Sequence, residues 1–213
     1  MLARAGQTTK LPPLHISLVK NIPPGSGLGG GSGNAAALLS WLHRMSGKKD
    51  PGPGEFGSDV PFLFSDAEWA AVSGRGEIIM PIPSPPETPS VLVAVPSWEM
   101  STQRAFSQLD KTWGGRFPMN ADEAEKETED LLDDLRNKRN VGLLPNDFLP
   151  ILHNLYPRYS DLFSAFGEYG ANGWGITGSG SACFGLFYEK SGLGDFFRDM
   201  TRYDWIRKIF CLE

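Results

Sequence analysis

A glycine-rich stretch, residues 22–36, lies between two segments of opposite character. The segment before it, Leu14–Lys20, alternates apolar and polar residues and predicts a half-buried strand. The segment after it, Ala35–Leu42, consists mainly of strong helix formers. Glycine lets a backbone approach an oxyanion closely, and the first N–H groups of a helix have no intrahelical partners. The sequence therefore predicts an anion site, best suited to phosphate, where a strand turns into a helix.

Two other phosphate-binding motifs fit this stretch less well. Gly25, Gly27 and Gly30 have the G-x-G-x-x-G spacing of a dinucleotide site. That site needs a second strand ending in an acidic residue about 20 residues further on, whereas residues 47–54 predict turns. No Lys-Ser or Lys-Thr pair follows the glycines, so the Walker motif is not matched. A dinucleotide-dependent oxidoreductase stays as a distant alternative.

Composition narrows the functional classes further. The chain has 213 residues, 40% of them hydrophobic, which suits one or two globular domains with a real core. Its formal net charge of -5 argues against nucleic-acid binding, and no apolar run approaches the roughly 20 residues that span a bilayer. Met1–Gly6 lacks the apolar region of a signal peptide, and only two cysteines are present. We therefore expect a cytoplasmic protein that binds neither nucleic acid nor a membrane.

A proline-rich segment, Pro81–Pro89, predicts an extended connector and a domain boundary. Strand and helix patterns are mixed along the chain, which indicates an α+β architecture. The acidic run from Asp122 to Asp134 predicts a solvated helix face or a mobile insertion. The other expected elements are a hairpin over 67–80, strands over 90–95, 182–188 and 205–211, and helices over 102–109, 148–156, 159–169 and 194–203. Ser101–Thr102 and Asn146–Asp147 are expected to cap the first two of these helices.

Three separated segments together resemble the GHMP kinase superfamily. They are the glycine-rich stretch KNIPPGSGLGGGSGNAA, the segment GSDVPFLF and a second small-residue loop, GITGSGSACFGLF. The shorter matches STQRAF and NDF lie between the last two, in the order that the family has. Within the superfamily, the sequence is most similar to the kinases of 4-diphosphocytidyl-2-C-methyl-D-erythritol. The resemblance covers most of the chain from His15 onward.

This resemblance implies a fold and a reaction. The GHMP kinase fold would comprise a truncated ribosomal-protein-S5-like subdomain over residues 1–88 and a ferredoxin-like subdomain over residues 89–213. The reaction would transfer the γ-phosphoryl group of ATP, with Mg²⁺, to the tertiary 2-hydroxyl of the cytidine diphosphate-linked methylerythritol, in non-mevalonate isoprenoid biosynthesis. Phosphoryl transfer depends mostly on positioning and charge stabilisation, so few side chains need unusual chemistry.

The resemblance also implies a nucleotide site. The backbone from Gly27 to Gly31 would wrap the phosphates, and Ser32 would add a hydroxyl or help to hold Mg²⁺. Asn34 lies where the family has a residue near the nucleotide. The expected ATP-binding residues are Pro24, Gly25, Ser26, Gly27, Leu28, Gly29, Gly30, Gly31, Ser32 and Asn34.

Asp59 matches the catalytic aspartate of the family, which accepts or orients the proton of the attacking hydroxyl. A carboxylate suits this role if it lies within about 3 Å of the attacking oxygen. Two structural roles are also open to Asp59, because it precedes an apolar stretch: a helix N-cap or an ion pair. The family match favours the catalytic role.

Thr102 and Phe106 match positions that line the cytidine pocket, where the aromatic ring stacks on the base. A simple core position within its helix is nearly as well supported for Phe106. Gly178, Ser179 and Gly180 match the third motif of the family, which lies beside the active site and supports the phosphate loop. The same three residues also predict a tight turn, and both roles can hold together.

The sequence departs from the family pattern at its beginning. The family starts with a strand carrying Lys-Ile-Asn-Leu or a close variant, whereas Met1–Ala5 resembles a later helix of the pattern. The catalytic lysine that partners the aspartate therefore has no counterpart, and the transferred phosphoryl group would lose a stabilising cation. Two alternatives stay open: an active kinase whose sequence here begins late, and a non-catalytic nucleotide-binding homologue.

Overall fold

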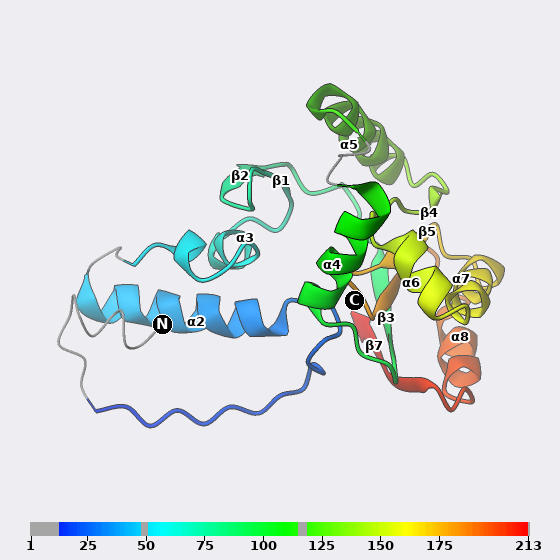
Figure 1. Ribbon diagram of the computed structural model, residues 1–213. Helices are drawn as coiled ribbons and strands as arrows, with labels where there is room; N and C mark the ends of the chain where they lie inside the picture. The colour runs from blue at the N-terminus through cyan, green and yellow to red at the C-terminus, as the bar shows by residue number, and fades with distance from the viewer. Residues whose placement is uncertain (1–12, 48–50, 115–118, 213) are drawn as a thin grey trace. The chain divides into compact units, whose positions relative to one another are not determined.

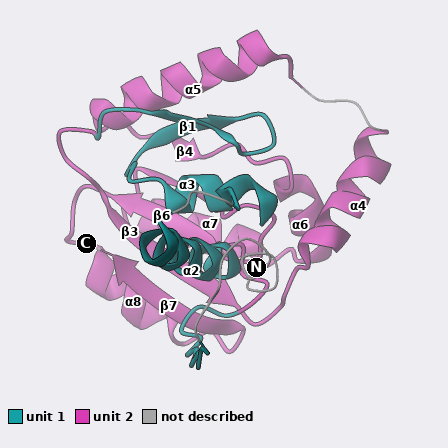
Figure 2. Cartoon of the chain, turned by 90° about the vertical axis from the view of Figure 1, so that its left-hand side faces the viewer, with its two compact units in different colours: residues 1–23, 29–84 teal, residues 24–28, 85–213 magenta. Residues whose placement is uncertain are grey.

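The computed structural model describes residues 13–47, 51–114 and 119–212 (Figure 1). The chain divides into two compact units, which Figure 2 colours separately. Unit 1 comprises residues 1–23 and 29–84, and unit 2 comprises residues 24–28 and 85–213. The glycine-rich stretch therefore contributes to both units, because residues 24–28 group with the second half of the chain.

Unit 1 contains the helix that follows the glycine-rich stretch. This helix, α2 (Gly30–Ser46), confirms the predicted helix and begins among the glycines themselves. Its flanking residues, Gly29 and Gly47, both have positive φ, a conformation that glycine adopts without steric cost. Every buried residue of α2 is apolar, and these residues recur every third position: Ala36, Leu39 and Leu42. The helix is therefore stabilised by packing of one narrow face.

The remaining elements of unit 1 are short. A 3-10 turn (Pro53–Glu55) precedes α3 (Val60–Phe64), and α3 packs against α2. The strands β1 (Ala70–Ser73) and β2 (Ile78–Pro81) form an antiparallel pair, which confirms the predicted hairpin.

The strand predicted over Leu14–Lys20 is not formed. Residues 13–20 are exposed and carry no strand, and no described strand pairs with them. An alternating pattern produces a strand only where a partner satisfies its backbone groups, so the prediction was wrong for the described chain. The turns predicted over 47–54 are confirmed where that segment is described. Residues 48–50 and the helix match at Met1–Ala5 lie outside the described residues.

Unit 2 is built on a five-stranded sheet with the order β4-β5-β6-β3-β7. Both β6 and β7 run antiparallel to β3, and β5 runs antiparallel to β6. With helices after β3 and after β6, this order is the split βαβ arrangement of ferredoxin-like folds, which confirms the expected α+β class. The strands are β3 (Ser90–Pro96), β4 (Gly142–Leu143), β5 (Gly173–Ile176), β6 (Cys183–Phe187) and β7 (Ile206–Leu212).

Three of these strands, β3, β6 and β7, confirm the sequence analysis, and two were missed. The strand β5 contains Gly173 and Gly175, which lower its strand propensity, so its sequence resembles the loop that follows it. The strand β4 has only two residues, and its parallel pairing with β5 gives no local sequence signal.

The helices predicted for unit 2 are confirmed, although their ends differ by a few residues. The hydroxyl of Ser101 accepts a hydrogen bond from the N–H of Arg104 and caps α4 as expected. The acidic run forms α5, an exposed helix capped by Asn120. None of the described helices is both long and apolar enough to cross a membrane. The helices are α4 (Thr102–Trp113), α5 (Ala121–Arg136), α6 (Leu149–Leu155), α7 (Tyr159–Glu168) and α8 (Leu193–Met200).

The main core lies between one face of this sheet and α6, α7 and α8 (Figure 1). The alternation along β3 sends Leu92 and Ala94 into this core, and Val93 and Val95 to a smaller cluster on the other face. Aromatic rings fill the centre of the main core, where Phe196 of α8 stacks on Phe166 of α7 with centroids 4.8 Å apart.

We predict that Phe196→Ala lowers the free energy of unfolding by about 3–5 kcal/mol, because it removes a ring that is 0% exposed and leaves a cavity. Phe197→Ala is the matched control, since the neighbouring ring is 44% exposed and its loss should cost far less. Urea unfolding followed by circular dichroism measures both values. Equal losses for the two variants would contradict the assigned core.

Candidate functional site

The glycine loop, residues 24–28, turns sharply before the chain enters α2. Gly25, Gly27 and the cap residue Gly29 have φ angles of 71°, 76° and 63°, in the left-handed region. Gly29 has no side chain that could accept hydrogen bonds from the first N–H groups of α2, which begins at Gly30. These groups can therefore bind an anion at the positive end of the helix dipole. The predicted passage from loop to helix is confirmed, and anion binding there stays a prediction.

Within unit 2, the glycine loop is hydrogen-bonded to residues 177–182, which form the loop between β5 and β6. The carbonyl of Gly25 accepts hydrogen bonds from the N–H of Ser181 at 3.2 Å and from its hydroxyl at 3.4 Å. The carbonyl of Ser26 accepts from the N–H of Ala182 at 2.8 Å and from the hydroxyl of Thr177 at 3.0 Å. These contacts fix the course of two successive residues of the glycine loop.

Gly27 marks the closest approach of the glycine loop to the 177–182 loop. A Cβ at this position would lie 2.2 Å from the carbonyl oxygen of Thr177 and 2.7 Å from that of Gly180. Both are backbone atoms, so a larger residue would force one of the loops to move. The next residue, Leu28, packs against the smaller cluster around Val93 and anchors the end of the loop.

In unit 1, the side chains of Ser32 and Asp59 lie next to each other. The hydroxyl of Ser32 donates to Oδ2 of Asp59 at 3.5 Å, at the limit of hydrogen-bond range. Ser32 belongs to the first turn of α2, and Asp59 immediately precedes α3. The exposed carboxylate does not cap α3, and it forms no ion pair with any described residue. Its structural roles as a cap or in an ion pair are therefore not supported in the described part of the chain.

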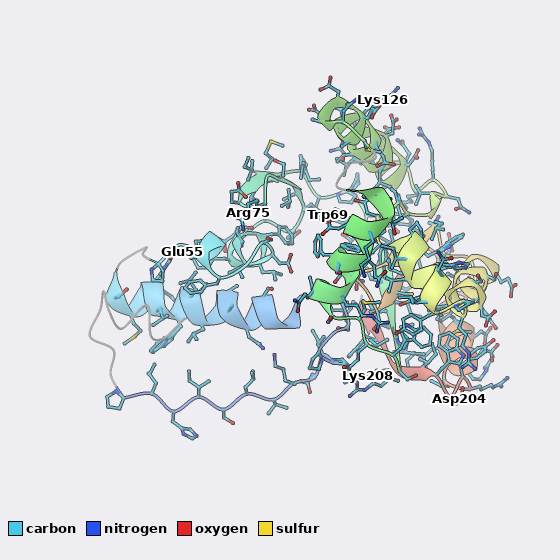
Figure 3. The ribbon with its side chains drawn as sticks, viewed as in Figure 1. Glu55, Trp69, Arg75, Lys126, Asp204 and Lys208 are labelled. Carbon is cyan, nitrogen blue, oxygen red and sulfur yellow. The ribbon has the colours of Figure 1, made fainter. Side chains whose placement is uncertain are left out.

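The backbone before Asp59 is supported by the turn between β1 and β2. Gly76 approaches it so closely that a Cβ there would lie 2.0 Å from the carbonyl oxygen of Ser58. A cleft of about 540 Å³ opens at this contact, and its walls carry charges of both signs, including Glu55 and Arg75 (Figure 3). Ser58, the residue before Asp59, lines this cleft, whereas Asp59 itself is not among its lining residues.

The two predicted cytidine-pocket residues lie one turn apart on α4 in unit 2. The hydroxyls of Thr102 and Ser179 are 3.3 Å apart, and either can donate to the other. Phe106 is 51% exposed, and its ring meets Phe148 edge to face with centroids 5.0 Å apart. A half-exposed ring that is held by one such contact can still stack on a base. The structure therefore overturns the alternative that Phe106 is simply a core residue.

Asn146 connects Gly178 to the start of α6. Its Nδ2 donates to the carbonyl of Gly178 at 3.0 Å, and its Oδ1 accepts from the N–H of Phe148 at 2.9 Å. The cap predicted at Asn146–Asp147 was wrong, because the cap residue of α6 is Phe148 and Asn146 supports the turn before it. A cleft of about 470 Å³ lies here, lined by Met119, Ala124, Glu127, Pro145, Asn146, Asp147, Phe148 and Gly178.

The predicted site residues fall into two groups, one in each unit, and their binding and catalytic roles stay predictions. The group in unit 1 lies on the first turns of α2 and just before α3: Gly29, Gly30, Gly31, Ser32, Asn34 and Asp59. The group in unit 2 comprises the glycine loop and residues on or near the 177–182 loop: Pro24, Gly25, Ser26, Gly27, Leu28, Thr102, Phe106, Gly178, Ser179 and Gly180.

Sequence analysis missed the residues that hold the glycine loop in place. The hydroxyls of Thr177 and Ser181 flank the predicted motif and both donate to the glycine loop. The sequence carries a signal for these two residues, because small hydroxyl residues in a turn commonly form hydrogen bonds to nearby backbone groups. Tyr159, which reaches the carbonyl of Ser181, gives no such signal, since an aromatic residue in a helix predicts core packing.

Two family models match this chain. The model of the GHMP kinases N terminal domain matches residues 1–52, which include the glycine loop. The model described as GHMP kinases C terminal matches residues 123–202, which include the 177–182 loop. The two loops that are bonded to each other in unit 2 thus lie in separate family models.

Two curated relatives from different organisms share one name. The 4-diphosphocytidyl-2-C-methyl-D-erythritol kinase of Nitratidesulfovibrio vulgaris (strain DP4) is 31% identical over 208 residues, covering 91% of this chain and 68% of the relative. A relative of the same name from Leptospira interrogans is 34% identical over 189 residues, covering 83% of this chain and 61% of the relative. This chain therefore spans about 60 to 70% of the length of these relatives.

Solved structures share the fold. The crystal structure of a 4-(cytidine 5'-diphospho)-2C-methyl-D-erythritol kinase matches with a TM-score of 0.68 and 24% identity, over 91% of this chain and 68% of that one. The homoserine kinase of Cytophaga hutchinsonii matches with a TM-score of 0.67 and 18% identity, over the same shares. Together with the family models and the curated relatives, these matches show that the chain belongs to the GHMP kinase family, among the 4-diphosphocytidyl-2-C-methyl-D-erythritol kinases.

Proposed function

We propose that this chain catalyses the ATP-dependent phosphorylation of the tertiary 2-hydroxyl of 4-diphosphocytidyl-2-C-methyl-D-erythritol, in isoprenoid precursor biosynthesis. The observation that carries the proposal is the bonding of the glycine loop to the 177–182 loop, which also contacts Thr102. A phosphate-binding backbone is thereby joined to the residues assigned to the cytidine end of the substrate. The names of the curated relatives support this choice of substrate.

We also propose a division into an N-terminal ATP-binding domain over residues 1–88 and a C-terminal domain over residues 89–213. The family models, at 1–52 and 123–202, support this order. A cytoplasmic protein that acts on small molecules, and not on nucleic acid or membranes, agrees with the net charge of -5. Both cysteines, Cys183 and Cys211, are free, which suits a reducing compartment.

In this proposal, the continuous segment from Gly25 to Ser32 holds the triphosphate of ATP. Backbone N–H groups contact the phosphate oxygens, and the start of α2 adds the positive end of its dipole. Such a site uses backbone groups rather than cationic side chains, so it depends on the exact course of the loop. The hydrogen bonds from Thr177 and Ser181 supply that constraint.

The hydroxyl of Ser32 would help to hold Mg²⁺, an ion that prefers oxygen ligands and usually keeps several waters beside the substrate phosphates. Oγ of Ser32 and Oδ2 of Asp59 are 3.5 Å apart, so an ion held by Ser32 would lie close to the carboxylate that receives the proton. The described residues contain no group of three or more His, Cys, Asp or Glu placed for a metal. When bound, the ion would neutralise charge on the phosphates.

Asp59 orients the acceptor hydroxyl and receives its proton as the bond to phosphorus forms. Its carboxylate is exposed, and the preceding residue, Ser58, lines the cleft that Arg75 and Glu77 also help to line. The cytidine would stack on Phe106, whose exposed face is available, while Thr102 and Ser179 supply hydroxyls beside it.

A non-catalytic nucleotide-binding homologue of the same kinases is the second candidate. The two candidates differ in phosphoryl transfer and not in ATP binding. A kinase assay on this chain, beside a version extended by any upstream in-frame coding sequence, separates them. Binding of MgATP without transfer by both proteins would favour the second candidate.

Asp59→Asn should lower kcat by about 10²–10⁴-fold, because the amide cannot accept the proton of the acceptor. MgATP affinity should change much less, and calorimetry on the same samples tests this. Asp66→Asn, at an exposed carboxylate beyond α3, is the control and should keep normal turnover. Normal turnover by Asp59→Asn would refute the assigned role.

Gly27→Ala should weaken MgATP binding at least about tenfold. A side chain here adopts an unfavourable positive φ and meets the carbonyl of Thr177, and each effect displaces the loop. Gly33→Ala is the control, because its Cβ would meet nothing within 4 Å. Calorimetric titration measures binding, with circular dichroism to verify folding. A folded Gly27→Ala protein with unchanged affinity would contradict a nucleotide-binding role for the loop.

Phe106→Ala should raise the KM of the cytidine-linked substrate by about 5- to 100-fold, the usual range for loss of one base–aromatic stacking contact. The KM of ATP should stay the same. Since the ring is half exposed, its removal should leave the protein folded. Steady-state kinetics with each substrate varied in turn provide the test. An effect on ATP alone would show that the pocket is wrongly assigned.

A further inference from the structure

The buried hydroxyl of Tyr159 has no role in core packing. The side chain is 0% exposed and lies at the first residue of α7. Its ring stacks on Phe163 with centroids 5.9 Å apart and packs edge to face with Trp98 at a centroid distance of 5.5 Å. A phenylalanine would make both ring contacts. Burying a hydroxyl costs free energy unless it is hydrogen-bonded, so its partners indicate what it does.

The hydroxyl of Tyr159 connects the core to the 177–182 loop. Nε1 of Trp98 donates to it at 3.0 Å, and it donates in turn to the carbonyl of Ser181 at 2.9 Å. Burial raises the pKa of Tyr159, so the hydroxyl keeps its proton at neutral pH and stays a donor. The direction of the contact is therefore fixed, from the tyrosine to the Ser181 carbonyl.

Ser181 extends this contact to the glycine loop. Its N–H donates to the carbonyl of Gly25, as does its hydroxyl. The segment after β3 reaches the same acceptor, because the N–H of Met100 approaches the Gly25 carbonyl at 3.4 Å. Three consecutive hydrogen bonds thus join Trp98 to Gly25 through Tyr159 and Ser181.

We propose that Tyr159 is a positioning residue for the nucleotide: its hydroxyl fixes Ser181, and Ser181 fixes the glycine loop in the conformation that binds phosphate. This inference depends on the proposed function for its ligand, a nucleoside triphosphate, but the contact to the loop can be tested without any ligand. Tyr159 does not touch the phosphates in this proposal. It acts entirely through the backbone of Ser181 and Gly25.

A glycine-containing loop needs such support, because its own residues restrain it little. Gly25 and Gly27 have more backbone freedom than any other residue type, and that freedom must be lost before the N–H groups can converge on phosphate. A loop already fixed by the core loses less entropy when the ligand binds. Removal of the Tyr159 hydroxyl therefore weakens binding without removing any group that contacts the ligand.

The test compares Tyr159→Phe with the unmodified chain. The amides of Ser181 and Ala182 donate to the glycine loop, and hydrogen exchange can be measured at both. Their exchange rates should be about tenfold higher in the variant. The Kd for MgATP should rise by about 5- to 10-fold, as expected for loss of one buried hydrogen bond. The KM of the cytidine-linked substrate should stay within about twofold, because Phe106 is not in this chain of bonds.

Tyr156→Phe is the matched control. Tyr156 belongs to the same aromatic cluster and stacks on Trp98 with centroids 4.9 Å apart. In the described chain its hydroxyl makes no hydrogen bond to Ser181, so this variant should change neither exchange nor MgATP affinity. Hydrogen exchange at Phe184, inside β6, distinguishes a local effect from a general loss of stability. Only a general loss of stability should raise the exchange rate at Phe184.

Each outcome decides one question. Unchanged exchange at Ser181 and unchanged MgATP affinity in Tyr159→Phe would overturn the inference. Faster exchange throughout β6 would also overturn it, because Tyr159 would then stabilise the core generally. If the unmodified chain binds no MgATP, the proposed function fails and with it the nucleotide role, whereas local exchange still decides whether Tyr159 holds the loop.

Discussion

The carbonyl groups of Gly25 and Ser26 are the acceptors on which the arrangement of the candidate site depends. Their hydrogen bonds to Ser181, Ala182 and Thr177 draw residues 24–28 into unit 2, although the residues on both sides belong to unit 1. The acceptors are backbone groups, so the contact does not depend on the side chains of the glycine loop, except at Gly27, where the distance leaves no space for a Cβ. It does depend on the donor hydroxyls of Thr177 and Ser181. A phosphate-binding role needs this combination, because N–H groups can converge on an anion only if the carbonyl groups are bonded elsewhere.

The phosphoryl transfer proposed for this chain depends more on the positions of the reacting groups than on their chemical reactivity. Phosphoryl transfer requires that phosphates, metal and acceptor be held in line, and few of the groups involved need unusual acidity. The Ser32–Asp59 pair fits this view, since a carboxylate and a hydroxyl 3.5 Å apart can hold a metal or a hydroxyl proton without burial. The role proposed for Phe106 is similar, because a half-exposed ring that packs against Phe148 would need only the right position to stack on a base.

Local sequence pattern was sufficient where an element is stabilised by its own residues. The helix α2, the cap at Ser101 and the buried strand β3 were all predicted, because propensity, capping and apolar runs act over a few residues. Leu14–Lys20 failed because a strand also needs a partner, and β5 was missed because its glycines resemble a turn. For the site, the two small-residue loops could be found from the sequence, but the role of Tyr159 could not. Its hydroxyl matters through one contact to a residue 22 positions away.

The bonds that anchor the glycine loop join residues very distant along the chain. The hydroxyl contacts from Thr177 to Ser26 and from Ser181 to Gly25 span 151 and 156 residues. Such contacts form late in folding, because closing so long a loop costs conformational entropy, and this cost is offset only when the sheet is complete. During synthesis, the glycine loop leaves the ribosome long before its partners exist. The loop therefore lacks its anchors until β6 has been made, so its anchored conformation is among the last features that the chain acquires.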